Sequence, residues 1–374
     1  MKEAFKTIIA RVKGMGLTKQ DISNSKGKKE KDKEKLTPED YANIIVVIAR
    51  CLNYEFCSFE GDVMYIFVNT HWQKIPNYDL KVFLKECLCS LLNDNVRGSK
   101  RKDVDDLIKQ FPYTIMSLNV QPAKNKINFL NGTLDLVGRK FEQHNPKDYI
   151  RYVLPYCFDK QATCPMFMKY LNRVVPDVEV QMVLAEYVSW IFTDIKLEKA
   201  MFLYGSGCNG KSVFIDIVEA LVGKENVCHE SITDMYGENG DNHRSNIIRK
   251  LLNTSSDIAP LVLHGDLFKS MISGESISTK QNVTSTTDYA KMLFSLNELP
   301  KKNDLASDYY RQLLIVPFNV QIPKSEIDPY LAKKIINDEL PGIMNWVLKG
   351  YVRLIQNQKF SDSKLIDSIL DDYK

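Results

Sequence analysis

The eight residues from 205 to 212 constrain the fold more than any other part of the chain. They fit the pattern GxxxxGK[ST] and are Gly205, Ser206, Gly207, Cys208, Asn209, Gly210, Lys211 and Ser212. An apolar run at 201–204 directly precedes the pattern, and apolar residues at helical spacing follow it from Val213 to Leu221. This order predicts a buried strand, a glycine-rich loop and a helix.

A strand, a glycine loop and a helix in this order can bind phosphate groups. Glycines let backbone N–H groups point inward around the phosphates, and the start of the helix adds partial positive charge. In this arrangement Lys211 reaches the β- and γ-phosphates, and the hydroxyl of Ser212 binds Mg²⁺. We therefore expect the eight loop residues to bind ATP, with Mg²⁺ as a second cofactor. The alternative is a glycine turn that binds no ligand.

Length and composition limit the architecture and the partners. One hydrophobic core rarely serves 374 residues, so two or three structural units are expected. The net charge of +3 results from 50 basic and 47 acidic residues, so any DNA-binding surface has to be local. The sequence has no apolar run near 18 residues and no secretory signal. We expect no membrane partner and a cytoplasmic location, in a bacterial host.

The chain is expected to comprise five segments. Residues 1–40 form a flexible charged segment that begins with an amphipathic helix, and residues 41–125 form a small α/β domain whose first helix starts at Thr37-Pro38. Residues 126–199 combine a hairpin at Asn131-Gly132 with two helices that are separated at Pro176-Asp177. Between 200 and 320, apolar runs alternate with helical stretches, which is typical of a parallel α/β sheet. Residues 321–374 are helical.

Three polar residues follow the loop in an order that fits nucleotide hydrolysis. Asp257 closes an extended run, and an acid at a strand end can hold Mg²⁺; a turn or capping aspartate is the alternative. Asn297 ends a second apolar run before a turn at Pro300, where it can orient an attacking water, or it is purely structural. Arg311 precedes a third apolar run and is either a charge-stabilising arginine finger or an ordinary exposed arginine.

The order of these motifs resembles the superfamily 3 helicases, specifically the phage and plasmid primase-helicase family related to the poxvirus primase-helicase. The resemblance covers roughly residues 60–360. It includes the segments Asn128–Asp135, His144–Pro146, Asp148-Tyr149, Glu186–Trp190 and Glu339–Gly350.

This resemblance implies an AAA+-type ring helicase, most simply a hexamer, that hydrolyses ATP between subunits during replication of a phage, plasmid or other mobile element. It assigns Lys211, Asp257, Asn297 and Arg311 to catalysis, and Ser212 and Asp257 to the metal. It also implies a pore hairpin between Asp257 and Asn297, which would grip single-stranded or forked DNA. Lys280 is our first choice for a DNA contact and Lys269 the second, with a solvated lysine as the alternative in each case.

The sequence departs from the family pattern at several points. Ser256 stands where a first acid often precedes Asp257, which leaves the general base open, with Asp266 and Glu275 as unsupported candidates. Gln312 replaces a second arginine. The first 125 residues are too few for a primase domain, so primer synthesis is expected to need a separate partner. The competing hypotheses are an ATP-switched replication initiator without robust unwinding, and a kinase or remodelling ATPase of another class.

Overall fold

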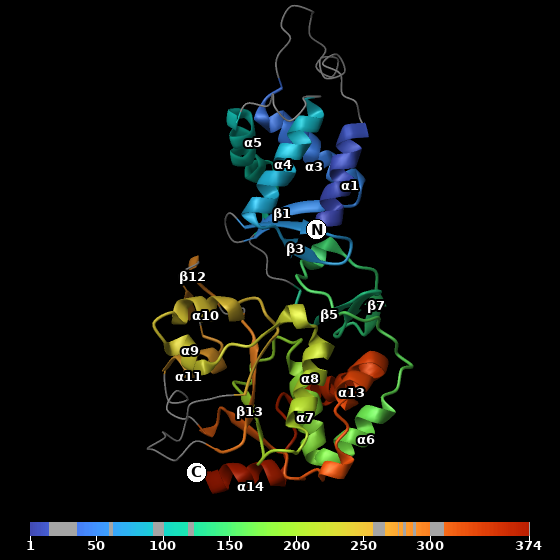
Figure 1. Cartoon of the computed structure of the whole chain (residues 1–374), viewed down its shortest axis with the longest axis vertical. Helices are drawn as coiled ribbons and strands as arrows, with labels where there is room; N and C mark the ends of the chain where they lie inside the picture. The colour runs from blue at the N-terminus through green and yellow to red at the C-terminus, as the bar shows by residue number, and fades with distance from the viewer. Residues whose placement is uncertain are drawn as a thin grey trace, which may run out of the picture. The chain divides into compact units, whose positions relative to one another are not determined.

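The computed structural model describes residues 1–14, 36–59, 63–92, 101–118, 123–256, 266–275, 277–279, 282–286, 289–299 and 310–373. These residues form two compact units of mixed α/β structure (Figure 1). Unit 1 comprises Met1–Ala123 and Glu142–Val153, and unit 2 comprises Lys124–Phe141 and Leu154–Lys374. Asp257 and Lys280 lie outside the described residues, as does the charged run from 15 to 35.

Unit 1 contains a four-stranded sheet in the order β3-β2-β1-β4. Its strands are β1 (Glu55–Phe59), β2 (Val63–Phe67), β3 (Trp72–Lys74) and β4 (Met116–Leu118). Strand β2 pairs with both β1 and β3 in antiparallel, and β4 pairs with β1 in parallel. The helices of this unit are α1 (Lys2–Gly14), α3 (Pro38–Cys51), α4 (Asn77–Leu91) and α5 (Arg101–Thr114).

The first helix belongs to unit 1 and corrects the expected extent of the flexible segment. Phe5, Ile8 and Val12 of α1 are buried in the same core as residues of α3, α4 and α5. The ring of Phe5 stacks on Phe83 of α4 with the centroids 4.2 Å apart. The amphipathic pattern near the N-terminus therefore pairs α1 with the small α/β unit, instead of starting a separate segment.

Unit 2 begins with a small antiparallel sheet and two helices. Strands β5 (Lys126–Phe129) and β6 (Gly132–Asp135) form the expected hairpin, and β7 (Lys140–Glu142) extends the sheet. Helices α6 (Pro165–Val174) and α7 (Val178–Trp190) are separated at the predicted break. The side chain of Asp177 caps α7 by accepting the N–H of Val180.

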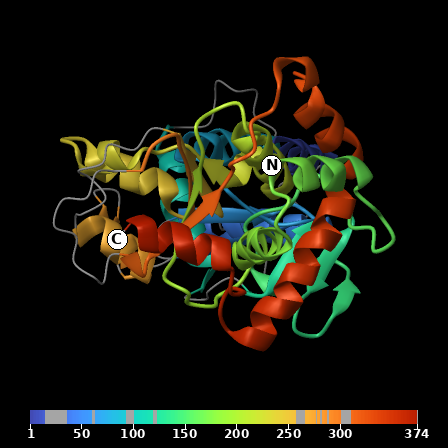
Figure 2. The ribbon, with the colours of Figure 1, turned by 90° about the horizontal axis from the view of Figure 1, so that it is seen from below.

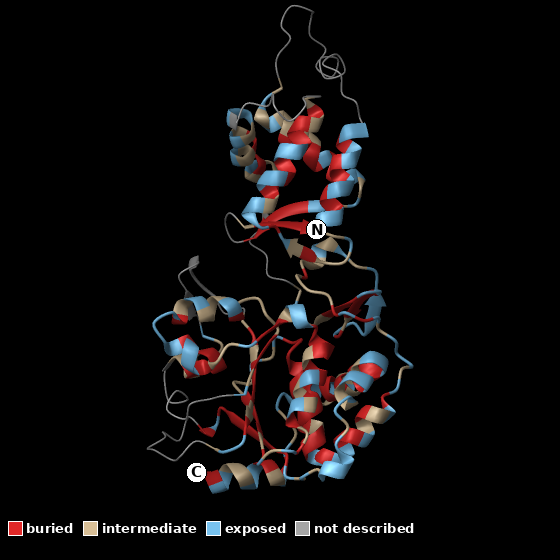
Figure 3. Cartoon of the chain, viewed as in Figure 1, coloured by how far each residue is buried: buried red, intermediate tan, exposed pale blue. Residues whose placement is uncertain are grey.

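A five-stranded parallel sheet forms the centre of unit 2. The strands are β8 (Ala200–Tyr204), β9 (Val227–Cys228), β10 (Leu252–Ser255), β13 (Lys291–Leu296) and β14 (Leu313–Pro317). Their order in the sheet is β14-β8-β13-β10-β9, and every neighbouring pair is parallel. The carboxyl ends of all five strands therefore meet at one edge of the sheet. Figure 3 shows these strands as largely buried, as their continuous apolar runs require.

Helices surround this sheet. Helix α8 (Lys211–Val222) follows β8 and packs against α13 (Leu331–Asn357), which also packs against α6 and α7 (Figures 1 and 2). Three short helices, α9 (Ile232–Tyr236), α10 (Gly240–Ile247) and α11 (Asp266–Ser273), lie between the strands in sequence, and α14 (Lys364–Tyr373) packs against β14. A two-stranded hairpin, β11 (Ile277–Thr279) with β12 (Asn282–Thr286), precedes β13.

Close helix packing explains the residue types at three positions of the segment Glu339–Gly350. The carboxylate of Glu339 accepts the backbone N–H groups of Met166 (2.9 Å) and Phe167 (2.8 Å), and so caps the start of α6. A Cβ at Gly342 would lie 2.2 Å from the carbonyl oxygen of Thr163, and a Cβ at Gly350 would meet the backbone of Ala185. This part of α13 therefore fixes the positions of α6 and α7.

Candidate functional site

The backbone of residues 205–212 turns sharply between β8 and α8. Gly207, Cys208 and Gly210 have positive φ values of 101°, 51° and 88°, which glycine adopts at little cost. Gly210 is the N-cap of α8 and contributes no side-chain cap. Because the first N–H groups of a helix lack acceptors within the helix, the loop presents donors and a positive dipole at the carboxyl edge of the sheet.

Gly205 occupies a position that has room for no side chain. A Cβ at this residue would lie 2.2 Å from Asn209 Nδ2 and 2.3 Å from the carbonyl oxygen of Phe318. The N–H of Gly205 donates to the carbonyl oxygen of Leu296, the last residue of β13, at 3.2 Å. The loop therefore starts in contact with the ends of both strands that flank β8.

Lys211 is buried in the loop, with 5% of its surface exposed. Its Nζ donates to the carbonyl oxygen of Gly205 (2.5 Å) and to Asn209 Oδ1 (2.9 Å). Burial lowers the pKa of the Lys211 ammonium, an effect that the nearby Cys208 thiol partly opposes. The loop thus holds a positive charge among its own polar groups, where an anionic ligand would be attracted.

The segment after β14 braces one side of the loop. Asn209 Nδ2 donates to the carbonyl oxygen of Phe318 at 2.8 Å, and the N–H of Ile322 donates to the carbonyl oxygen of Cys208 at 2.8 Å. Gln321 Nε2 lies 3.4 Å from Ser206 Oγ. Ser206, Cys208 and Ser212 have exposed side chains. Ser212, in the first turn of α8, is therefore free to bind a ligand beside the loop.

Helix α6 also contacts the loop. The hydroxyl of Tyr170 donates to the carbonyl oxygen of Gly210 at 2.7 Å, and the Tyr170 ring and Val174 surround the position of a Cβ at Gly210. Sequence reasoning missed Tyr170 because it belongs to the apolar face of an amphipathic helix. Nothing in the local sequence marks a contact across 40 positions.

Asn297 lies at the same edge of the sheet as the loop. It follows Leu296, which pairs with Tyr204 in the register of β13 and β8, so that Asn297 stands opposite Gly205. Its side chain is exposed. The next strand, β10, ends at Ser255, and Ser256 is exposed. The structure brings Asn297 to the loop as expected, whereas the position of Asp257 is not described.

Arg311 lies at the opposite edge of the sheet. It precedes β14, and its guanidinium is 3.8 Å from the carboxylate of Glu198, a residue that precedes β8. The Arg311 side chain is 65% exposed. A strand of five residues spans about 16 Å, so Arg311 is well separated from the loop of its own chain. The structure does not bring these two predicted site residues together.

The structure describes only one of the two lysines that were predicted to contact DNA. Strands β11 and β12 form a hairpin between β10 and β13, as expected, and Lys280 lies in the two residues that connect Thr279 to Asn282. Lys269 lies on α11 and is half-buried. Helix α11 contacts β11. The contribution of either lysine to DNA binding stays a prediction.

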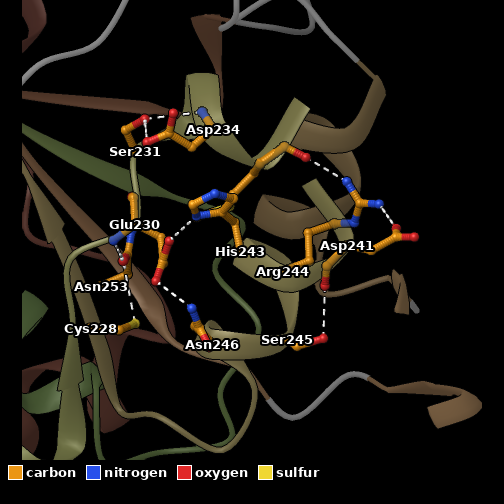
Figure 4. A network of polar contacts seen from close by, with 11 residues as sticks. Cys228, Glu230, Ser231, Asp234, Asp241, His243, Arg244, Ser245, Asn246 and Asn253 are labelled. Carbon is orange, nitrogen blue, oxygen red and sulfur yellow. Dashed lines mark hydrogen bonds and ion pairs between the residues drawn. The ribbon is translucent and has the colours of Figure 1, made fainter. Parts of the chain in front are cut away.

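A polar network links β9, β10 and α10 (Figure 4). Glu230, just after β9, binds His243 Nδ1 (2.5 Å) and Asn246 Nδ2 (2.8 Å) of α10. The buried side chain of Asn253 on β10 accepts the N–H of Glu230 (2.8 Å) and donates to its carbonyl oxygen (2.9 Å). These contacts fix α10 to the ends of β9 and β10.

The described part of the chain contains neither a cluster of metal ligands nor a helix that could span a membrane. Within it, no three His, Cys, Asp or Glu side chains cluster as metal ligands would. Among the same residues, no helix is both long and apolar enough to cross a membrane. The expected Mg²⁺ ligands, Ser212 and Asp257, are only two, and Asp257 is not described.

Comparisons with known proteins match different parts of the chain. A family model described as "D5 N terminal like" matches residues 53–176, and a "Family of unknown function (DUF5906)" matches residues 203–311. The "Uncharacterized mitochondrial protein ymf21" of Marchantia polymorpha is 26% identical over 150 residues, which cover 36% of this chain and 83% of that protein.

Solved structures show the fold over most of the chain. An apo structure of the C-terminal region of NrS-1 matches with a TM-score of 0.59 and 11% identity, and covers 91% of this chain and 76% of that one. A second apo structure of this region has a TM-score of 0.56 and 12% identity, with the same coverage. The chain therefore shares the fold of the NrS-1 C-terminal region. The D5 N terminal like match supports the relationship to phage and plasmid primase-helicases that the sequence motifs indicate.

Proposed function

We propose that this chain is an ATP-hydrolysing DNA helicase of superfamily 3, built on an AAA+-type core and active in replication of a phage, plasmid or other mobile element. The observation that carries the proposal is the buried Lys211 in a glycine loop at the carboxyl edge of a parallel sheet, with Asn297 on the adjacent strand end. Ligands of open α/β sheets bind at this edge.

The loop residues have separate tasks in nucleotide binding. The N–H groups at the start of α8 and the loop peptides donate to phosphate oxygens, and the Lys211 ammonium exchanges its contacts with Gly205 and Asn209 for the β- and γ-phosphates. Ser212 and Asp257 would hold Mg²⁺, which would supply neutralisation of the charge that develops on the phosphates. Asn297 orients the attacking water.

Arg311 requires a second subunit. It lies at the amino edge of the sheet, whereas the loop of its own chain lies at the carboxyl edge. An arginine that stabilises charge on the phosphates therefore has to come from a neighbouring copy, whose amino edge faces this loop. Such head-to-tail contacts close into a ring, and a hexamer is the proposed form. The proposed contact to single-stranded DNA is made by Lys280, which lies between β11 and β12 in the sequence, and by Lys269 on α11, which contacts β11.

The proposal is tested with Lys211→Ala and a matched lysine variant at the other end of α8, Lys224→Ala. Lys224 is exposed and lies outside the loop. We expect the wild type and Lys224→Ala to bind ATP, hydrolyse it and displace a strand from forked DNA, and Lys211→Ala to lose all three activities. Unchanged ATP binding and turnover in Lys211→Ala would refute the assignment of the loop.

A second candidate is an ATP-switched initiator, and the exposed Ser256 favours it. With a hydroxyl where a first acid often precedes Asp257, turnover could be too slow for a motor. The forked-DNA assay separates the two candidates. ATP-dependent DNA binding without strand displacement supports the switch, whereas displacement that requires hydrolysable ATP supports the helicase.

A further inference from the structure

The carbonyl oxygen of Gly210 accepts two hydrogen bonds. The Tyr170 hydroxyl donates to it from α6 at 2.7 Å, and the N–H of Phe214 donates to it within α8 at 3.1 Å. Tyr170 is 5% exposed. Burial raises the pKa of the Tyr170 hydroxyl far above its ordinary value, so the group stays protonated and remains a donor at any practical pH.

The direction of this carbonyl determines the direction of the next N–H. The peptide bond between Gly210 and Lys211 is planar and trans, so its C=O and N–H point in opposite directions. With the carbonyl directed toward Tyr170 and Phe214, the Lys211 N–H points the other way, toward the N-terminal end of α8, where the loop lies. A rotated peptide would instead direct a carbonyl oxygen at the phosphates and repel them.

Gly210 needs this restraint because it is a glycine. Gly210 has a φ of 88°, and a glycine with such a φ rotates readily into other backbone conformations. A larger residue would restrict the rotation but does not fit, since a Cβ would lie 2.8 Å from Val174 Cγ1 and 3.2 Å from the Tyr170 ring. The hydrogen bond from Tyr170 therefore adds a second restraint to the one that the Phe214 N–H provides within α8.

Helix α6 is itself held in place, which makes it a suitable support. The carboxylate of Glu339 on α13 accepts the first N–H groups of α6. The ring of Phe167 packs against Trp346 of α13 with the centroids 5.1 Å apart. Arg173 of α6 donates to Glu326 at 3.0 Å, which links the helix to the chain that follows β14.

We propose that Tyr170 is a positioning residue for nucleotide phosphates: its hydroxyl fixes the Gly210–Lys211 peptide with the Lys211 N–H directed into the loop. This inference rests on the proposed ATP binding and goes beyond it, because it assigns to a helix outside the loop the task of orienting a phosphate donor. Tyr170 does not touch the ligand. It acts through the backbone of Gly210.

The test compares Tyr170→Phe with Tyr156→Phe. The hydroxyl of Tyr156 is also buried and donates to the carbonyl oxygen of Leu221 at 3.0 Å, at the other end of α8. Both variants remove one hydroxyl that donates to a carbonyl of the same helix, so a general loss of packing would affect both. The Phe214 N–H still satisfies the Gly210 carbonyl in Tyr170→Phe, and the variant is expected to fold.

We expect Tyr170→Phe to raise the KM for ATP and the Kd for ADP about three- to tenfold, which corresponds to the free-energy contribution of one hydrogen bond. The kcat of the variant should stay within about twofold of the wild-type value. Tyr156→Phe should match the wild type in all three constants. Equal KM and Kd values in the two variants would overturn the inference. Loss of binding in Lys211→Ala but not in Tyr170→Phe would refute the positioning role alone, whereas a wild type without nucleotide binding would refute the proposed function and this inference with it.

Discussion

Replacement of Gly205 by alanine tests the packing of the loop directly. The added Cβ would lie 2.2 Å from Asn209 Nδ2 and 2.3 Å from the carbonyl oxygen of Phe318. The φ of Gly205 is not positive, so the cost of the substitution is steric. The side chain of Asn209 is 2% exposed and cannot move aside without losing its contacts.

Those contacts set the size of the effect. Displaced, Asn209 loses its hydrogen bond to Phe318 (2.8 Å) and the one that it accepts from the Lys211 ammonium (2.9 Å). A neutral hydrogen bond contributes about 1 kcal/mol and one to a charged group about 1.5–3 kcal/mol. The sum is about 3 kcal/mol, before any shift of the backbone at Phe318. For a domain of this size, the expected fall in Tm is roughly 6–12 °C.

Thermal unfolding with and without ATP measures this effect. The matched control is Gly237→Ala in the same unit, where a Cβ would have its nearest atom at 3.5 Å, an ordinary contact. Gly207→Ala isolates backbone strain, because its φ is 101° and the space around it is open. We expect Gly205→Ala to unfold well below both controls and to show no stabilisation by ATP. Unfolding at the temperature of Gly237→Ala, with a normal response to ATP, would refute the reasoning.

Three further predictions concern other parts of unit 2. Arg311→Ala should bind ATP but lose turnover, and mixing it with Lys211→Ala should restore part of that turnover; full activity of the single variant would exclude a trans role. Lys280→Ala should lose DNA stimulation of ATPase activity while basal hydrolysis persists, and an unaltered DNA response would contradict the pore contact. Burial lowers the pKa of Lys291 to about 8, although its Nζ lies 3.9 Å from the Trp190 ring centroid. Between pH 8 and 10 the Lys291 amine is protonated in the unfolded chain but not in the folded one, so stability rises with pH. In denaturant titrations, the free energy of unfolding of the wild type should rise by about 1–2 kcal/mol relative to Lys291→Met as the pH is raised from 8 to 10. A difference between the two proteins that does not change with pH would contradict the lowered pKa of Lys291.

Local sequence signals predicted the local structure well. The strand, loop and helix around Gly205–Ser212, the hairpin at Asn131-Gly132 and the helix start at Asp177 all depend on residues within a few positions of each other. The Thr37 side chain likewise accepts the N–H of Asp40, as the capping pattern predicts. Turn and cap residues act through their own backbone, so a single sequence is sufficient to find them.

Long-range contacts could not be predicted in the same way. Glu339 reads as an ordinary helical acid, yet it caps a helix 172 positions earlier in the chain. Glu186 is fully buried and accepts from Arg353 (2.9 Å) and from the N–H of Ser361 (2.7 Å). The family resemblance included the segments Glu186–Trp190 and Glu339–Gly350, but it gave no physical reason for the acids in them. Their partners come from packing that only the folded chain defines.

The fold accounts for two of the loop glycines without any ligand. Gly205 and Gly210 are required because Asn209, Phe318, Val174 and Tyr170 occupy the space of a Cβ. Their presence in the sequence is therefore weak support for nucleotide binding. Lys211 is different, because its ammonium is buried within the loop and donates to the carbonyl oxygen of Gly205 and to Asn209 Oδ1 at the carboxyl edge of the sheet. Burial lowers the pKa of this ammonium, and an anion bound in the loop would oppose that effect. Lys211, more than the glycine pattern, therefore supports the proposed binding of phosphate groups.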